Sequence, residues 1–198
     1  TNLPVSIKTR LGYTYLDEFR TWLVTILKEQ PVALTVHLRT RKEMSKVPAH
    51  YELIPEIAGI RKAFSPETRL VINGDIKDLK QVRELSEKCP QVDGWMIGRG
   101  VFENPYCFTE HMPSREELMG LLDYHLRLFD EKDAELRLKR ARALGEGRDI
   151  EVRGLAFEPL KHYFKIYVSG FPGAAELRAR MMECKNTEEV RRVLGCNL

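Results

Sequence analysis

The hydrophobic pattern of the first half of the chain alternates between short apolar runs and longer amphipathic segments. Continuous runs of strand length are typical of parallel strands buried on both faces, and we expect strands over residues 5–10, 33–37, 70–72 and 94–97. The segments between them have apolar residues at helical spacing, which predicts helices over residues 16–29, 51–64 and 78–87. This βα order predicts an α/β fold. It supplies half of a (β/α)₈ TIM barrel, because a complete barrel takes about 250 residues.

The second half of the chain has no strand-like run after Val101 and is predicted to be all-α. Pro113 marks its beginning, and Ser114 with Glu117 forms a capping-box signature that opens a helix. Further helical segments are expected over residues 136–144, 159–169, 174–182 and 187–194, with a polar loop over 145–149. We therefore expect two domains, residues 1–112 and residues 113–198.

Composition and charge place the chain among ordinary globular proteins. It has 198 residues, of which 43% are hydrophobic and 31% charged, and a formal net charge of +3, too small to argue for nucleic acid by itself. The four cysteines form no CxxC pair, which favours free thiols over a disulfide framework or a zinc site. No apolar run is long enough to span a bilayer and no signal peptide is evident, so we expect a cytoplasmic protein without membrane contact.

Polar or glycine residues follow each expected strand at its carboxyl end. The four groups are Lys8 with Arg10, His37 with Arg39, Asn73 with Asp75, and Gly98 with Arg99. The carboxyl ends of parallel strands converge on one rim, where ligands bind, so one shared site is favoured over four coincidences. Taken singly, these residues also have structural explanations. Lys8 could be a strand-end lysine, His37 a hydrogen-bonded core histidine, and Asn73 with Gly74 a turn.

Two of these strand ends suit a phosphate group. Glycine lets a backbone N–H approach a ligand closely, so Gly74 and Gly98 would cradle a phosphate while Arg99 pairs with it. Lys8 and His37, nearer the barrel axis, would lie against a flat, electron-accepting ring, where a cation stabilises the reduced form. The pattern predicts a phosphorylated redox cofactor and no metal.

The same residues carry a resemblance to a known family. In this order and spacing, the chain resembles the FMN-dependent tRNA-dihydrouridine synthases through the motifs V-S-I-K-T-R-L-G, L-T-V-H-L-R-T-R, V-I-N-G-D-I and W-M-I-G-R-G-V-F-E-N-P. The stretch K-H-Y-F-K-I-Y-V-S-G-F-P-G-A-A-E-L-R, residues Lys161 to Arg178, is similar to the helical tRNA-binding domain of that family. The resemblance covers nearly the whole chain and implies strands 5–8 of the barrel.

The resemblance also implies roles for individual residues. Lys8 and His37 would contact the flavin ring, and the ribityl phosphate would lie along Asn73, Gly74, Asp75, Gly98 and Arg99. Arg10 and Arg39 would be on the substrate side. The family usually has glycine where this chain has Leu38, so backbone approach to the cofactor at that position differs.

The implied reaction reduces the C5=C6 bond of a uridine in tRNA. NADPH reduces FMN, the flavin delivers hydride to C6 of the extruded base, and a cysteine in an N-x-G-C-P-like loop donates a proton to C5. That context surrounds none of Cys89, Cys107, Cys184 and Cys196. We therefore expect no catalytic residue in this chain, which starts at Thr1 without Met as if cut from a longer one, and place the cysteine in a missing N-terminal half.

The helical half contains a locally basic run with aromatic residues interleaved. Its basic members are Arg137, Lys139, Arg140, Arg142, Arg148, Arg153, Lys161 and Lys165. A solvated helix face is the alternative, because acidic residues flank the run, but the barrel context favours a surface that tracks RNA phosphates. The expected RNA contacts there are Arg140, Lys161, Lys165 and Arg178.

An isolated half-barrel leaves two strand edges unpaired and one apolar face uncovered. We therefore expect the chain either to pair with a missing N-terminal half-barrel or to self-associate through the same edges. Two alternatives stay open: another flavin- or phosphate-binding barrel oxidoreductase, and a non-catalytic RNA-binding module.

Overall fold

The computed structural model describes residues 3–144 and 152–195, so the polar loop expected over 145–149, together with Arg148 and Cys196, lies outside the described residues. The chain divides into two compact units, residues 1–111 and residues 112–198. None of the helices within the described ranges is long and apolar enough to cross a membrane.

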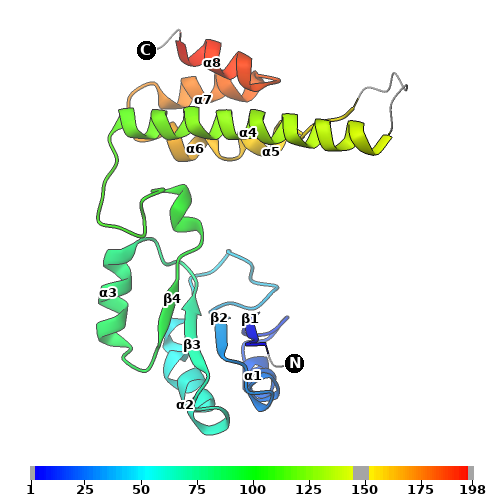
Figure 1. The fold of residues 1–198 in the computed structure, drawn as a ribbon. Coiled ribbons are helices and arrows are strands. Elements are labelled where there is room, and N and C mark those ends of the chain that lie inside the picture. The colour runs from blue at the N-terminus through cyan, green and yellow to red at the C-terminus, as the bar shows by residue number, and fades with distance from the viewer. Residues whose placement is uncertain (1–2, 145–151, 196–198) are drawn as a thin grey trace. The chain divides into compact units, whose positions relative to one another are not determined.

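The first unit is an α/β layer built on a four-stranded parallel sheet (Figure 1). Its strands are adjacent in chain order: β1 (Ser6–Arg10), β2 (Ala33–His37), β3 (Arg69–Asn73) and β4 (Gly94–Met96). Its helices are α1 (Glu18–Lys28), η1 (Tyr51–Leu53), α2 (Ile54–Phe64), α3 (Leu79–Lys88) and η2 (Arg99–Phe102). The predicted alternation of strands and helices is confirmed, and it is consistent with part of a TIM barrel.

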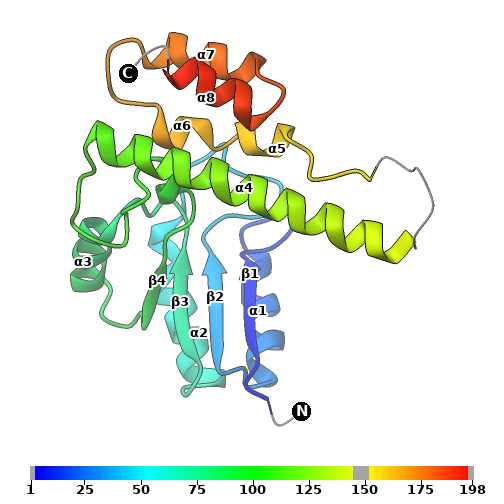
Figure 2. The same ribbon diagram turned by 45° about the horizontal axis from the view of Figure 1, so that its top comes forward.

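One face of this sheet forms the hydrophobic core of the unit. Alternate residues of a strand point to opposite faces, so Leu34 and Val36 share a face with their register partners Leu70 and Ile72. All four side chains are fully buried and belong to one cluster with residues of α1 and α2. Figure 2 shows both helices on the same side of the sheet. Because this packing holds the strands together in register, the polar residues at the strand ends have defined positions on the opposite face.

Local sequence signals set the helix ends in the first unit. The Asp78 carboxylate accepts a hydrogen bond from the Gln81 backbone N–H at 2.8 Å and caps α3, as its position before the helix predicts. Pro55 lies in the first turn of α2, where its missing N–H has no intrahelical partner to lose. Both helices therefore begin directly after the loops that carry candidate site residues.

The second unit is helical throughout its described residues. Its helices are α4 (Arg115–Leu144), α5 (Glu158–Lys161), α6 (Phe164–Tyr167), α7 (Ala174–Glu183) and α8 (Thr187–Gly195). The predicted capping box is confirmed. The Ser114 N–H donates to the Glu117 carboxylate at 2.7 Å, and the Glu117 N–H donates to the Ser114 hydroxyl at 3.2 Å.

The single helix predicted over residues 159–169 is wrong, because the structure has two short helices there. Between α5 and α6 the backbone makes tighter bonds between residues three apart: the Tyr163 N–H donates to Leu160, and the Ile166 N–H donates to Tyr163. Leu160 and Phe164, four residues apart on either side of this break, both lie in the buried core of the unit. The separately predicted basic helix over 136–144 is the last part of α4.

Candidate functional site

The register of the sheet brings three of the expected site residues together. Arg10 at the end of β1 pairs in register with His37 of β2, and His37 pairs with Asn73 of β3. Lys8 lies two residues before Arg10 and so shares the same face of the sheet. This is the face opposite the α1 and α2 core. The predicted convergence of strand ends on one rim is therefore present in the structure.

The turn after β3 has a backbone conformation that requires its sequence. Gly74 has a φ of +133°, and a Cβ built there would lie 3.0 Å from the Ala49 Cβ, so no other residue fits without strain. Asp75 follows with a φ of +53°, a region that Asp enters more readily than most residues. The Tyr51 hydroxyl donates to the Gly74 carbonyl oxygen at 2.5 Å. This turn is held by a residue from the loop after β2.

Asp75 is the centre of a charged network at this turn. One of its carboxylate oxygens accepts from Arg39 Nη2 and from the Ala49 N–H, the latter at 3.1 Å. The other oxygen lies 3.3 Å from Arg99 Nη2. Partial burial works to raise the Asp75 pKa, but the hydrogen bonds from Arg39 and Ala49 and the two positive charges outweigh it and hold the pKa below its ordinary value. Asp75 is therefore a carboxylate at neutral pH.

Arg39 is a buried cation rather than an open surface group. Its side chain is 3% exposed, and its Nε donates to the Val47 carbonyl oxygen at 2.6 Å. Its third nitrogen, Nη1, is buried and has no hydrogen-bond partner among the described residues. The expected substrate contact of Arg39 stays a prediction, whereas its contacts in the structure are with Asp75 and Val47.

His37 is an electrically neutral group in a cationic setting. Burial, followed by the nearby charges of Arg10, Lys8 and Arg39, lowers its pKa to about 4. Its Nδ1 is buried and lacks a hydrogen-bond partner within the described part of the chain. A buried ring nitrogen without a partner carries a desolvation cost that a bound ligand would remove.

The rim of β1 has an excess of positive charge. Burial and then the charge of Arg10 lower the pKa of Lys8, and burial with the charges of Arg41 and Arg39 lowers that of Arg10. Arg10 Nη1 donates to the Thr40 carbonyl oxygen at 3.0 Å, which fixes it against the loop after β2. Mutually repelling cations held at a strand end favour an anionic ligand.

The loop after β4 combines an open glycine with a tightly packed one. The nearest heavy atom to a Cβ built on Gly98 is Asn73 Nδ2 at 3.9 Å, so the space beside Gly98 is free for a ligand. A Cβ on Gly100 would instead overlap the Lys77 carbonyl oxygen. Arg99 stands between them with a side chain that is 67% exposed. Asn73 Nδ2 donates to the Met96 carbonyl oxygen at 2.8 Å and ties the ends of β3 and β4 together.

Sequence reasoning missed several residues that build this rim. Ala49 and Tyr51 hold the Gly74 turn, and the strand pattern gives no signal for either, because Ala49 lies in the loop after β2 and Tyr51 is the first residue of η1. His50 joins the same loop through both ring nitrogens, at 2.9 Å from Glu43 and 2.9 Å from Glu52. Gly100 belongs to the Gly-Arg-Gly motif, but the reason that this position needs glycine is the Lys77 carbonyl oxygen, which is distant in the sequence and close in space.

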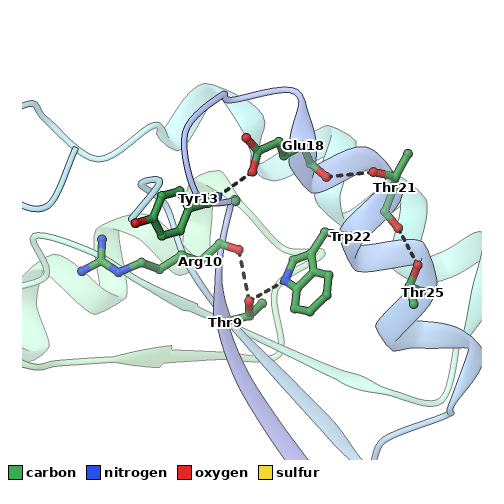
Figure 3. Close-up of a pocket in the computed structure, with 8 residues that line it drawn as sticks. Thr9, Arg10, Tyr13, Glu18, Thr21, Trp22 and Thr25 are labelled. Atoms are coloured by element: carbon green, nitrogen blue, oxygen red, sulfur yellow. Dashed lines mark hydrogen bonds between the residues drawn. The ribbon is translucent and has the colours of Figure 1, made fainter. Parts of the chain in front are cut away.

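A separate cavity of about 480 Å³ lies at the edge of the sheet between β1 and α1 (Figure 3). The Glu18 carboxylate accepts from the Tyr13 and Tyr15 backbone N–H groups at 2.6 and 2.8 Å, which fixes the loop that bounds it. Trp22 Nε1 donates to Thr9 Oγ1 at 2.7 Å on its other side. Arg10 is the residue that this cavity shares with the candidate site.

Two of the expected RNA contacts in the second unit have internal partners. Lys161 is 8% exposed, and its Nζ donates to the Met182 carbonyl oxygen at 2.8 Å and pairs with Glu158 at 2.8 Å. The prediction of Lys161 as a surface contact does not match this burial. Arg178 donates to the Val168 carbonyl oxygen at 2.5 Å and so caps the end of α6.

The other two expected RNA contacts lie on the surface of the second unit. Lys165 is exposed on α6. Arg140 is exposed on α4, and its Nη1 donates to the Arg153 carbonyl oxygen at 2.6 Å, so part of the group is engaged in holding the returning chain. The expected RNA contacts of the second unit therefore divide into buried, capping and solvent-facing residues.

Comparison with known proteins gives a consistent result. The profile of the family described as Dihydrouridine synthase (Dus) matches residues 1–197. The chain is 50% identical over 196 residues to a probable tRNA-dihydrouridine synthase 2 of Bacillus subtilis (strain 168), and 45% identical over 196 residues to a probable tRNA-dihydrouridine synthase of Staphylococcus epidermidis. A probable tRNA-dihydrouridine synthase of Staphylococcus aureus is 44% identical.

Each of these alignments covers 97% of this chain and 54% of the relative, so the chain spans about half the length of the curated relatives it matches. The family match extends over both structural units, the strand ends as well as the helices. The chain therefore belongs to the dihydrouridine synthase family.

Proposed function

We propose that this chain is the part of a flavin-dependent tRNA-dihydrouridine synthase that holds the FMN phosphate and docks tRNA. The observation that carries the proposal is the common register of Arg10, His37 and Asn73 beside two glycine-containing loops. In this proposal β1–β4 are strands 5–8 of the barrel and residues 113–198 form the tRNA-binding domain. The enzyme reduces the C5=C6 bond of a tRNA uridine, with NADPH as the reductant.

The residues at the rim fit FMN. The open space beside Gly98, the exposed guanidinium of Arg99 and the Gly74 turn suit the phosphate, with Asn73 and Asp75 between them. The unpartnered Nδ1 of His37 and the ammonium of Lys8 suit polar atoms of the ring. When bound, FMN supplies the hydride for the reduction. Lys8 would offer a positive charge beside the ring, and His37, neutral at its lowered pKa, would offer a hydrogen-bonding nitrogen without adding charge.

The proton donor of this reaction is assigned to residues outside this chain. Cys107 is fully buried and Cys184 nearly so, and burial is the main factor that raises the pKa of both thiols. Cys89 ends α3, away from the carboxyl ends of the strands. None of these three thiols has the exposed position that a group protonating a bound base needs.

We propose tRNA as the partner that Arg10, Lys165, Arg140 and Arg178 face. Lys165 is the strongest candidate, because it is exposed. Lys161 is left out of this surface because its ammonium group is engaged inside the second unit. Arg39 is assigned an indirect role, because its side chain is buried against Asp75.

We propose that the open edges of β1 and β4 are covered in the working enzyme by further barrel strands, or by a second copy of the chain. The support is the exposure of large apolar side chains around β1 and α1: Trp22 is 48%, Val5 46% and Tyr13 72% exposed. Sedimentation of the isolated chain tests this. Self-association is expected, and a compact, stable monomer would argue against it.

The main experiment is flavin binding by the purified chain. We expect FMN to bind with its characteristic visible absorbance, and Arg99→Ala to weaken its retention. Arg83→Ala is the matched control, because Arg83 is an exposed arginine of α3 paired with Glu110 away from the rim. Equal retention by Arg99→Ala and Arg83→Ala would contradict the phosphate assignment. A chain that binds tRNA but no flavin would favour a non-catalytic RNA-binding module, and one that binds flavin but no tRNA another barrel oxidoreductase.

A further inference from the structure

Asp75 connects three separate loops of the sheet rim through one carboxylate. It belongs to the turn after β3, it accepts from Arg39 and Ala49 in the loop after β2, and it lies 3.3 Å from Arg99 in the loop after β4. The position of this one side chain therefore affects the whole proposed phosphate site.

The role of Asp75 cannot be to bind a phosphate through its own side chain. A carboxylate repels a phosphate, and the Asp75 carboxylate is ionised because Arg39 and Ala49 hold it in that form. Arg39 in turn needs Asp75 as a counter-ion. Its side chain is only 3% exposed, so losing Asp75 would leave an uncompensated buried charge. The Arg39–Asp75 pair is thus a fixed element, and one oxygen of Asp75 remains directed at Arg99.

The Asp75 carboxylate holds the Arg99 side chain in one orientation. A side chain that is 67% exposed loses considerable rotamer freedom when it binds a ligand, and a partner that holds it beforehand reduces that loss. The backbone beside it is held too, because Tyr51 binds the Gly74 carbonyl oxygen at 2.5 Å and Gly74 packs against Ala49. The cationic group and the glycine backbone are both set before a ligand arrives.

We propose that Asp75 is a positioning residue, not a phosphate contact, and that it orients Arg99 toward the phosphate of the cofactor while the buried Arg39 holds it in place. The inference rests on the proposed function, because it concerns the same anion site. It assigns to Arg39 a role in cofactor binding rather than a direct substrate contact.

The deciding experiment compares FMN with riboflavin, which lacks the phosphate. Dissociation constants of both are measured for the whole chain and for the double variant Arg39→Met with Asp75→Asn. The double variant removes one positive and one negative charge, so the net charge near the phosphate is unchanged, and asparagine tolerates the positive φ of position 75. Because Arg39→Met removes the buried charge together with its counter-ion, no uncompensated charge is left inside the protein and the fold is expected to survive.

We expect the double variant to lose about tenfold in its preference for FMN over riboflavin, with riboflavin affinity itself nearly unchanged. Asp93→Asn is the control, because Asp93 pairs with Arg61 at 3.6 Å and lies before β4, at the opposite end of the strands. That variant is expected to keep the preference of the unchanged chain.

A second measurement separates positioning from general loosening of the fold. If Asp75 acts through Arg99, then Arg99→Ala should cost much less FMN affinity in the double variant than in the unchanged chain. Equal costs in the two backgrounds, or a full FMN preference in the double variant, would overturn the inference and leave the proposed function intact. An unchanged chain that binds FMN and riboflavin equally well would instead refute the phosphate site itself.

Discussion

The charged residues of the sheet rim and those of the helical unit have very different relations to their neighbours. At the rim, Arg10, His37 and Asn73 occupy neighbouring positions because the parallel ladder fixes which residues face one another. In the helical unit, Lys161 and Lys165 are four residues apart, yet one is buried in the unit and the other is exposed. Backbone pairing determines the first arrangement, whereas side-chain packing alone determines the second.

The comparison shows how far a charge pattern can be interpreted without a structure. A polar residue at the end of a parallel strand has a predictable location, because every such end lies on one rim. A lysine or arginine on a helix has several uses of similar energy: it can face solvent, cap a carbonyl group or extend its stem over apolar surface. The following predictions test whether these two regions differ in energy as they do in geometry.

The largest effect is expected from removing the counter-ion of a buried arginine at the rim. Asp75→Ala leaves the Arg39 guanidinium buried without a counter-ion, and we expect the free energy of unfolding to fall by about 3 kcal/mol. Glu188→Ala breaks the Glu188–Arg192 pair of α8, whose side chains are 72% and 70% exposed, and should cost less than about 0.5 kcal/mol. Urea unfolding of both variants measures the difference. Similar midpoints would show that burial of the Arg39 charge has no energetic consequence.

The two glycines of the loop after β4 should separate stability from binding. Gly100→Ala places a Cβ against the Lys77 carbonyl oxygen, so we expect a loss of about 1–3 kcal/mol in unfolding free energy. Gly98→Ala has free space and should unfold like the unchanged chain, but its methyl group occupies the space assigned to the phosphate and should weaken FMN binding. Denaturation and FMN titration of both variants check this. If neither variant binds FMN more weakly than the unchanged chain does, Gly98 is not part of the phosphate site.

The two lysines of the helical unit should give opposite results. Lys161→Met keeps the apolar stem but leaves the Met182 carbonyl oxygen without its donor, and should cost about 1–2 kcal/mol in stability without changing tRNA affinity. Lys165→Ala should leave stability unchanged, weaken tRNA binding and reduce its dependence on salt concentration by about one phosphate contact. Binding measured at several salt concentrations provides the test. A salt dependence that changes only in the Lys161 variant would reverse our assignment.

The strands and the rim could be predicted from the sequence, because buried strands give a local signal and their polar ends must then lie together; the family could be predicted because its motifs recur in order along nearly the whole chain. An apolar run such as Leu70 to Ile72 is typical of a buried strand, and the Asn-Gly-Asp that follows must then lie at the rim. The capping box at Ser114 is local in the same sense, since both of its hydrogen bonds lie within one turn.

The rest depends on contacts between residues far apart in the chain. The family resemblance places Arg39 on the substrate side, and only the structure shows that its buried side chain pairs with Asp75. Tyr51 is 23 residues from the carbonyl group that it binds. The break between α5 and α6 has no proline or glycine to mark it.

The effect that is smallest at neutral pH concerns two histidines, one in each region. Burial lowers the pKa of both His37 and His125, but nearby cations lower that of His37 further, to about 4. Because the folded-state pKa of His37 lies below its unfolded value of about 6.5, the unfolded chain binds more protons between these values. His37 therefore makes stability fall as the pH drops from about 6.5 to 4, and His37→Gln should flatten that part of the profile. Salt screens the charges of the cations but does not change how deeply a side chain is buried. High salt should therefore raise the pKa of His37 and leave that of His125 unchanged, and NMR titration measures both values. Equal shifts would mean that the charge of Lys8, Arg10 and Arg39 does not distinguish the rim from the helical unit.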